Sequence, residues 1–492
     1  MFIHLKFYLR SRIMYTWILV AGALNSFIDA CGIGSNDLAN SFGTTYGSKV
    51  LTVFQIIILA SIFEFSGAMV LGSPVTNTLA GSISNVAYFK AQPYVLMYGM
   101  LCALAGSSTW LYTATYLGLP VSTTHSIVGG IMGFSLVYKG VDGVVWLKSI
   151  PDFPYVSGFV PIVISWVSSP IICAAISAGI YSTIRYGIIK SEHAIQRSVY
   201  FLPVVVFFTF WIEFLFILSK GAGSRITWDI GTTVWVSLCI GAGASLLSLG
   251  FIPPLQKKIA NYTPTVLPIE DKTSTEVKMV DLSGASVPTT ELSGARVDLS
   301  GVVLDLSGAL VTKEHVDDIY DPRIEYSFSY LQIFTSICTS FAHGANDVSN
   351  AVGPLAAIWY IHENGAVSSK IEVPPWILAL GGAGIVVGLA TYGIKIMEVL
   401  GKKITYISPL RGFAAELATA LVVSFASKYG LPISSTQCIT GAVVGISLCD
   451  KNLKDLNWKI MGKIFVSWIF TILVTGAISA AVFSQGVYSP NM

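Results

Sequence analysis

The sequence predicts an all-α polytopic membrane protein with about 12 transmembrane elements, built as inverted repeats with broken or re-entrant helices. The first observation behind this prediction is composition. Of the 492 residues, 53% are hydrophobic and only 11% are charged, and the mean hydropathy is +0.69; a soluble globular chain carries about 25% charged residues. The second observation is that two polar motifs, unusual in so apolar a chain, each occur twice in the same order.

Apolar stretches of roughly membrane-spanning length account for most of the predicted elements, since a hydrocarbon core of about 30 Å needs about 20 residues of helix. Shorter apolar pieces follow Asn36, Pro120, Asn346 and Pro432, so we expect some elements to be broken at these points. The longer stretches lie near 15–33, 51–72, 94–117, 155–182, 199–219, 231–253, 327–342, 373–394, 408–429 and 459–484.

The two duplicated motifs define the internal repeat. GSNDLAN at 34–40 corresponds to GANDVSN at 344–350, and GLPVSTTH at 118–125 corresponds to GLPISSTQ at 430–437. Polar, Gly- and Pro-interrupted segments at corresponding places in two halves are the pattern of a transporter whose substrate site lies between the repeats. We therefore expect the two copies of each motif to build one site.

A composition change separates the halves. Charged and turn-forming residues concentrate between about 254 and 326, where DLSGA and its variants begin at 281, 291, 298 and 305. We divide the chain into a first transmembrane repeat (1–150), middle transmembrane spans (151–253), a hydrophilic loop (254–326) and a second repeat with a terminal span (327–492). Basic residues in the loop favour a cytoplasmic position for it, whereas Lys6, Arg10 and Arg12 favour a cytoplasmic N-terminus; we expect the loop to be cytoplasmic.

The GLP motifs predict an oxyanion site. Pro120 suits the first turn of a helix, where no N–H donor is needed, and hydroxyls follow it beside the unpaired N–H groups of that turn. The alternative is that these hydroxyls only join helices through hydrogen bonds. The residues predicted to bind this oxyanion are Ser122, Thr123, Thr124, Ser434, Ser435 and Thr436.

The GSND and GAND motifs predict cation sites. Asp37 and Asp347 interrupt apolar segments, where an unpaired carboxylate is costly. Side-chain carbonyls beside them, with backbone carbonyls of an unwound helix, offer the oxygen shell that a hard cation prefers. Helix capping is the alternative role for the aspartates. The predicted sodium ligands are Asn36, Asp37, Asn40, Asn346, Asp347 and Asn350.

Three further acids lie in apolar spans. Glu64 and Glu416 are candidate functional residues, because intramembrane carboxylates are functional candidates by default. The alternative for Glu416 is an ion pair with Arg411 near a helix start. Glu213 lies outside the repeats, and we expect a structural role for it. His125 is answered by Gln437 in the second copy, so we expect a hydrogen-bonding helix residue, not a proton relay.

The chain resembles the inorganic phosphate transporter family of sodium- or proton-coupled secondary transporters. GSNDLANSFGT and GANDVSNAVGP are similar to its signature, and the GLP motifs match its second repeated motif. The resemblance covers about 15–140 and 325–450. It implies an inverted-repeat fold, alternating access, phosphate carried with cations, and sodium as the usual ion of the eukaryotic branch. It also implies a role in transport for Glu64 and Glu416, which fall at positions similar to acidic residues that the family uses for transport. Ser35 and Ser349 depart from the family's common alanine and could adjust ion selectivity.

We therefore predict a sodium-coupled phosphate symporter; a proton-coupled phosphate transporter, a sulfate transporter and a passive re-entrant-helix pore are the alternatives. The chain carries no HExxH, GxSxG or nucleotide-binding loop, so we expect no enzyme. We expect no cofactor beyond coupling sodium ions. The expected partners are phosphate, sodium and the lipid bilayer of the plasma membrane, with a homodimer left open. No basic patch points to nucleic acid.

Overall fold

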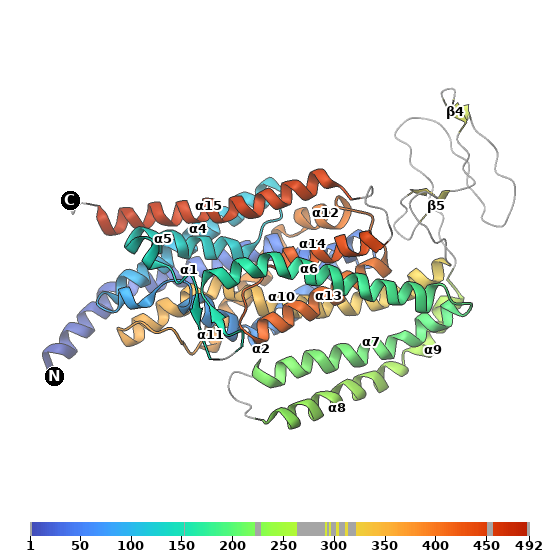
Figure 1. Cartoon of the computed structure of the whole chain (residues 1–492), viewed down its shortest axis with the longest axis horizontal. Helices are drawn as coiled ribbons and strands as arrows, with labels where there is room; N and C mark the ends of the chain where they lie inside the picture. The colour runs from blue at the N-terminus through green and yellow to red at the C-terminus, as the bar shows by residue number, and fades with distance from the viewer. Residues whose placement is uncertain are drawn as a thin grey trace.

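The computed structural model describes residues 2–151, 153–221, 228–262, 321–449 and 456–489, together with four short strands within 291–312. Its long helices confirm the predicted all-α polytopic architecture, and most of them run along one axis (Figure 1). The N-terminal end of α1 and the C-terminal end of α15 lie at one end of the bundle, and strands β4 and β5 lie beyond the other end.

The helices follow one another along the whole described chain. They are α1 (Phe2–Gly47), α2 (Val53–Leu71), α3 (Ser73–Gly81), α4 (Pro93–Leu117), α5 (Thr123–Lys139), α6 (Phe159–Ile184), α7 (Ala194–Phe216), α8 (Ile230–Leu249), α9 (Ile252–Ala260), α10 (Pro322–Asn364), α11 (Pro375–Tyr392), α12 (Ile394–Lys402), α13 (Pro409–Lys428), α14 (Ser435–Cys449) and α15 (Trp458–Tyr488). Antiparallel strand pairs are β1 (Lys148–Ser149) with β2 (Val156–Ser157), β3 (Glu291–Leu292) with β4 (Ala295–Arg296), and β5 (Val302–Leu304) with β6 (Leu310–Thr312).

Nine helices in the described part of the chain are long and apolar enough to cross a membrane. They are α1, α2, α4, α6, α7, α8, α11, α13 and α15. The 43-residue helix α10 is long enough to cross a membrane but is more polar than these nine helices, because it carries the GAND motif. Most of its residues are buried inside the bundle. α3, α5, α12 and α14 are shorter helices that complete the two repeats.

The two halves are built from the same series of elements. In order, α1–α6 correspond to α10–α15. The two halves pack against each other: α1 on α11 and α12, α10 on α2 and α3, α5 on α15, and α14 on α6. Glycines permit the closest of these approaches. A Cβ on Gly34 would overlap the carbonyl oxygen of Ile385, and a Cβ on Gly344 would overlap that of Glu64. Small residues at helix contacts are how membrane helices pack closely.

The expected breaks in the GSND and GAND segments are wrong. α1 runs unbroken through Asn36 and α10 runs unbroken through Asn346. The reason is that the polar side chains of these motifs find partners on neighbouring helices, so the backbone keeps its own hydrogen bonds, as a span in hydrocarbon requires. The interruptions lie elsewhere, at Gly72 between α2 and α3 and at Gly393 between α11 and α12.

The GLP motifs form the tips of two re-entrant hairpins. The α4–α5 hairpin begins and ends at the end of the bundle that holds the N-terminus. There Asn85 N, before α4, donates to Gly143 O, after α5, at 2.8 Å. The α13–α14 hairpin opens at the opposite end, where Leu410 N donates to Glu325 Oε2 near the start of α10. The prediction for Pro120 is wrong in detail, because it precedes the helix: Ser122 is the N-cap and α5 begins at Thr123.

The segments outside the repeats lie at the edge of the bundle. α7 and α8 pack on each other (Figure 1), and the buried carboxylate of Glu213 on α7 accepts from Ser424 Oγ on α13 at 2.8 and 2.9 Å, which agrees with a structural role. The predicted loop begins within α9 and ends within α10. Its recurring DLSGA motif falls largely outside the described residues.

Candidate functional site

Serine caps begin both hairpin helices. Ser122 Oγ accepts from His125 N at 3.2 Å, and Ser434 Oγ accepts from Gln437 N at 3.3 Å. The remaining N–H groups of each first turn give these helix ends a partial positive charge. The ring of His125 lies 3.2 Å from the carbonyl oxygen of Trp468, so this histidine serves as a hydrogen-bonding helix residue, as the sequence predicted.

The two hairpin tips touch each other at the centre of the bundle. Thr124 Oγ1 donates to Ile433 O at 2.9 Å, and Thr436 Oγ1 donates to Val121 O at 3.2 Å. The two bonds are related by the internal repeat. Two positive helix ends that come from opposite ends of the bundle therefore meet at one place.

Each aspartate of the duplicated motif binds the hairpin of its own half. Thr123 Oγ1 donates to Asp37 Oδ2 at 2.9 Å, and Ser435 Oγ donates to Asp347 Oδ2 at 2.6 Å. All four side chains are buried. The structure thus brings the predicted anion and cation residues into direct contact, with a carboxylate beside each helix end.

The last asparagines of the two motifs, Asn40 and Asn350, connect the halves to each other. Each sits on the long helix of one repeat and donates from its Nδ2 to two hydroxyls at the hairpin tip of the other repeat. The bonds run from Asn40 to Ser435 (3.1 Å) and Thr436 (2.9 Å), and from Asn350 to Thr123 (3.1 Å) and Thr124 (3.3 Å). The reciprocal pattern makes one site from two half-sites.

The asparagines that precede the aspartates brace the hairpins. Asn36 Nδ2 donates to Thr115 Oγ1 at 3.0 Å, while its Oδ1 accepts from Val121 N at 3.0 Å. In the second half, the side-chain amide of Asn346 likewise lies 3.2 Å from Ser427 Oγ on α13. These contacts hold the extended backbone ahead of each hairpin helix; the sodium-ligand role of both asparagines stays a prediction.

His343 bridges the carboxylates and was missed by the sequence reasoning. Its Nδ1 lies 2.8 Å from Glu64 Oε2, and its Nε2 lies 2.8 Å from Asp347 Oδ2 and 3.7 Å from Asp37 Oδ2. Both ring nitrogens face carboxylate oxygens, an arrangement that suits an imidazolium, which has two N–H donors. A histidine one helical turn before an intramembrane aspartate was the available signal.

In its neutral form, with Nε2 unprotonated, His343 instead forms a candidate cation centre together with Asp37 and Asp347. One ligand atom from each lies within 4.8 Å of the others, and all three residues are buried. Two carboxylates facing one imidazole leave negative charge uncompensated in an apolar bundle. The donor set is rich in oxygen, which fits a hard monovalent cation better than a soft metal.

Glu416 lies apart from this centre, in a shell of hydroxyl donors that comes from both long helices. The carboxylate is fully buried. No basic side chain pairs with it in the described residues. Its donors are Thr44, Thr45 (2.8 Å), Thr335 (2.8 Å), Ser336 (2.9 Å) and Gln332 (3.4 Å).

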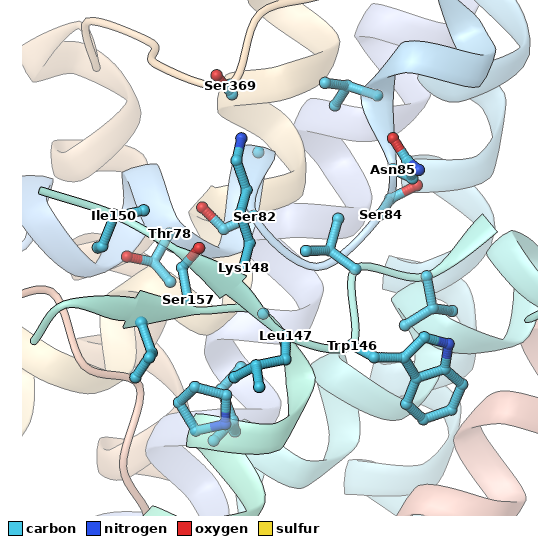
Figure 2. Close-up of a pocket in the computed structure, with 18 of the residues that line it drawn as sticks. Thr78, Ser82, Ser84, Asn85, Trp146, Leu147, Lys148, Ile150, Ser157 and Ser369 are labelled. Atoms are coloured by element: carbon cyan, nitrogen blue, oxygen red, sulfur yellow. The ribbon is translucent and has the colours of Figure 1, made fainter. Parts of the chain in front are cut away.

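A cavity of about 1080 Å³ lies at the end of the bundle where α4 begins and α5 ends. Lys90, Lys148 and Lys370 line it, and Figure 2 shows Lys148 on β1 extending toward Ser82 and Ser369. Gly430–Pro432, which lead into the second hairpin tip, also line the cavity. Asp142 also lines this vestibule, so its charged lining residues carry a net positive charge, which would attract anions toward this tip.

The chain matches known proteins over nearly its whole length. A family model described as "Phosphate transporter family" matches residues 33–479. The chain is 30% identical to the Phosphate-repressible phosphate permease pho-4 of Neurospora crassa, over 97% of this chain and 98% of that protein. It is 29% identical to the Sodium-dependent phosphate transporter 1-A of Danio rerio, over 96% and 95%. A solved structure, "The sodium-dependent phosphate transporter", matches with TM-score 0.76 and 31% identity over 95% of this chain and 98% of that one.

Proposed function

The chain belongs to the phosphate transporter family, and on that premise we propose that it carries inorganic phosphate across a membrane, driven by sodium, by alternating access. Its relatives are permeases and transporters, so the chain is a membrane transport protein and not an enzyme. The observation that carries the proposal is the reciprocal bonding of Asn40 and Asn350 to the hairpin tip of the opposite repeat.

Phosphate would bind between the hairpin tips. Helix N-termini present N–H groups and a positive field to an oxyanion, and hydroxyls surround them. Thr124 and Thr436 now donate to carbonyls of the opposite tip, so the tips must part and these hydroxyls must turn to the substrate. The proposed phosphate ligands remain Ser122, Thr123, Thr124, Ser434, Ser435 and Thr436.

Sodium would bind beside the phosphate at Asp37 and Asp347. When a cation arrives, each carboxylate is neutralised, and the threonine or serine hydroxyl that it holds becomes free to donate to phosphate. Cation and anion would therefore favour each other's binding, a coupling that must be reciprocal. Side-chain carbonyls complete the proposed shell, from Asn36, Asn40, Asn346 and Asn350.

Glu64 and Glu416 would couple this site to the rest of the bundle. Glu64 acts through His343, which joins it to both aspartates. Glu416 accepts from Thr45 on α1 and from Thr335 on α10. A change in the hydrogen bonds of this carboxylate would therefore alter its contacts with both long helices. Intramembrane acids in such positions commonly serve ion movement.

Alternating access would follow from the inverted repeat. The two hairpins open at opposite ends of the bundle, so motion of one repeat against the other exposes the shared site to one side at a time. We further propose a plasma-membrane location and a cytoplasmic position for the loop between the repeats. A homodimer would leave this mechanism unchanged, because the site is complete within one chain.

The deciding experiment is uptake of labelled phosphate into proteoliposomes of the full chain. Three conditions are compared: an inward sodium gradient, an inward proton gradient, and neither. Sodium-driven, saturable uptake that arsenate inhibits and sulfate does not would support the proposal. Uptake driven only by protons would overturn sodium coupling, inhibition by sulfate would overturn phosphate selectivity, and gradient-independent, non-saturable flux would indicate a pore.

A further inference from the structure

A second carboxylate lies on the same face of α1 as Asp37. Asp29 precedes Asp37 by two helical turns, about 12 Å along the axis. Its side chain is fully buried, and neither carboxylate oxygen has a hydrogen-bond partner. Within the described residues no basic side chain pairs with it. An isolated carboxylate in a membrane bundle is costly unless something neutralises it.

The side chain of Ser107 on the neighbouring helix α4 lies near the Asp29 carboxylate. The Ser107 hydroxyl is itself fully buried and has no hydrogen-bond partner. One residue further, Ser108 Oγ donates to Asn25 Oδ1 at 3.0 Å, which places a side-chain carbonyl one turn from Asp29. We call these three side chains the Asp29 pocket: the carboxylate of Asp29 and the hydroxyl of Ser107 have no hydrogen-bond partner, and the amide oxygen of Asn25 accepts one hydrogen bond, from Ser108.

The internal repeat relates this pocket to the shell around Glu416. With the spacing of 310 residues between the duplicated motifs, Asn25 and Ser26 correspond to Thr335 and Ser336. The hydroxyls of Thr335 and Ser336 donate to the Glu416 carboxylate. Asp29 falls on Thr339, whose hydroxyl bonds the Glu416 backbone. Because the repeats are inverted, the two pockets lie on opposite sides of the central site.

We propose that Asp29, with Ser107 and Asn25, forms a further sodium site on the side of the central site away from Glu416. The inference rests on the proposed sodium-driven function. All of the ligand atoms are oxygens, which suits a hard cation. A single carboxylate neutralises one positive charge, so a monovalent ion leaves the buried pocket neutral, whereas a divalent ion would leave a net charge in it.

Asp29→Asn and Ser107→Ala test the site in the full-length protein, with Glu213→Gln as the matched control because Glu213 is another buried intramembrane acid and lies outside the repeats. One readout is the sodium concentration for half-maximal phosphate uptake. Another is the rise in melting temperature when choline chloride is replaced by sodium chloride, since an ion that binds only the folded protein stabilises it.

We expect Asp29→Asn to raise the half-maximal sodium concentration about tenfold, because a charged ligand is lost, and to reduce the sodium-dependent rise in melting temperature. Ser107→Ala should show the same changes to a smaller degree. It tests the site on its own if Asp29→Asn does not fold. Glu213→Gln should match wild type in both readouts.

Wild-type sodium dependence in both pocket variants would overturn the inference, as would altered proton inhibition with unaltered sodium dependence, which would make Asp29 a proton site. Failure of the proposed function has a different signature. In that case the wild-type protein itself shows no sodium-driven uptake, and the melting temperature still reports whether sodium binds at Asp29.

Discussion

The side-chain amide of Asn40 donates to the hydroxyl of Ser435 over 3.1 Å, although the two residues lie 395 positions apart in the chain. Ser435 in turn donates to Asp347. A residue of the first repeat is therefore bonded to the proposed anion-binding tip of the second repeat, and the Ser435 hydroxyl at that tip is bonded to a carboxylate. Movement of one repeat against the other must change this chain of bonds.

Asn40→Ala and Ser435→Ala should each raise the KM for phosphate, and their effects should not add. Residues in one hydrogen-bond network show interaction energies of about 0.5–3 kcal/mol in a double-mutant cycle. The measurement is phosphate uptake by wild type, both single variants and the double variant. Additive effects would mean that the bond plays no part in transport.

Asp37→Asn and Asp347→Asn should each lower sodium-driven uptake about tenfold or more, because a buried charged ligand is replaced by a neutral one. Both variants should still insert and elute as folded protein on size-exclusion chromatography. Glu213→Gln is the control for loss of a buried acid outside the site. Unchanged sodium-dependent uptake in both aspartate variants would refute their proposed role.

Glu416→Gln should reduce transport more than Glu398→Gln. The amide would place an NH₂ group among hydroxyls that now donate to a carboxylate, such as those of Thr45 and Thr335, and a hydrogen bond to a charged group contributes about 1.5–3 kcal/mol. Glu398 is exposed, so its change controls for general loss of negative charge. Equal uptake by the two variants would contradict a coupling role for Glu416.

Lys148→Gln should raise the KM for phosphate about threefold at low ionic strength, with the difference shrinking at high salt as screening removes it. Lys139→Gln removes the same charge from an exposed position outside the cavity and should leave the KM unchanged. Uptake is measured in both variants as a function of ionic strength. A salt-independent KM in Lys148→Gln would argue against anion capture by the vestibule.

Gly344→Ala should lower the melting temperature and the yield of folded protein, because the new Cβ would overlap the carbonyl oxygen of Glu64. Overpacking of this kind typically costs about 1–3 kcal/mol. Gly179→Ala is the matched control, since no heavy atom lies within 4 Å of its added Cβ. Equal melting temperatures for the two variants would mean that α10 and α2 can move apart without a loss of stability.

The sequence predicted most of the residues of the candidate site but not the contacts between them. The duplicated motifs identified Asp37, Thr123 and their counterparts as members of one site, and the structure joins them directly. The break expected near Asn36 was wrong because a polar motif in an apolar segment signals either unwinding or a partner on another helix, and composition does not distinguish these. His343 and Asp29 escaped notice because neither belongs to a duplicated motif.

The sequence by itself determined the membrane class, the duplication and the residue types of the site, because hydropathy and motif spacing are local properties that one chain displays directly. Only the tertiary structure decided that α1 and α10 remain continuous, that each asparagine bonds the opposite repeat, and that His343 lies between Glu64 and Asp347. Those choices depend on close contacts and hydrogen bonds between helices that lie far apart in the sequence. No local pattern encodes which distant partner will satisfy a buried polar side chain.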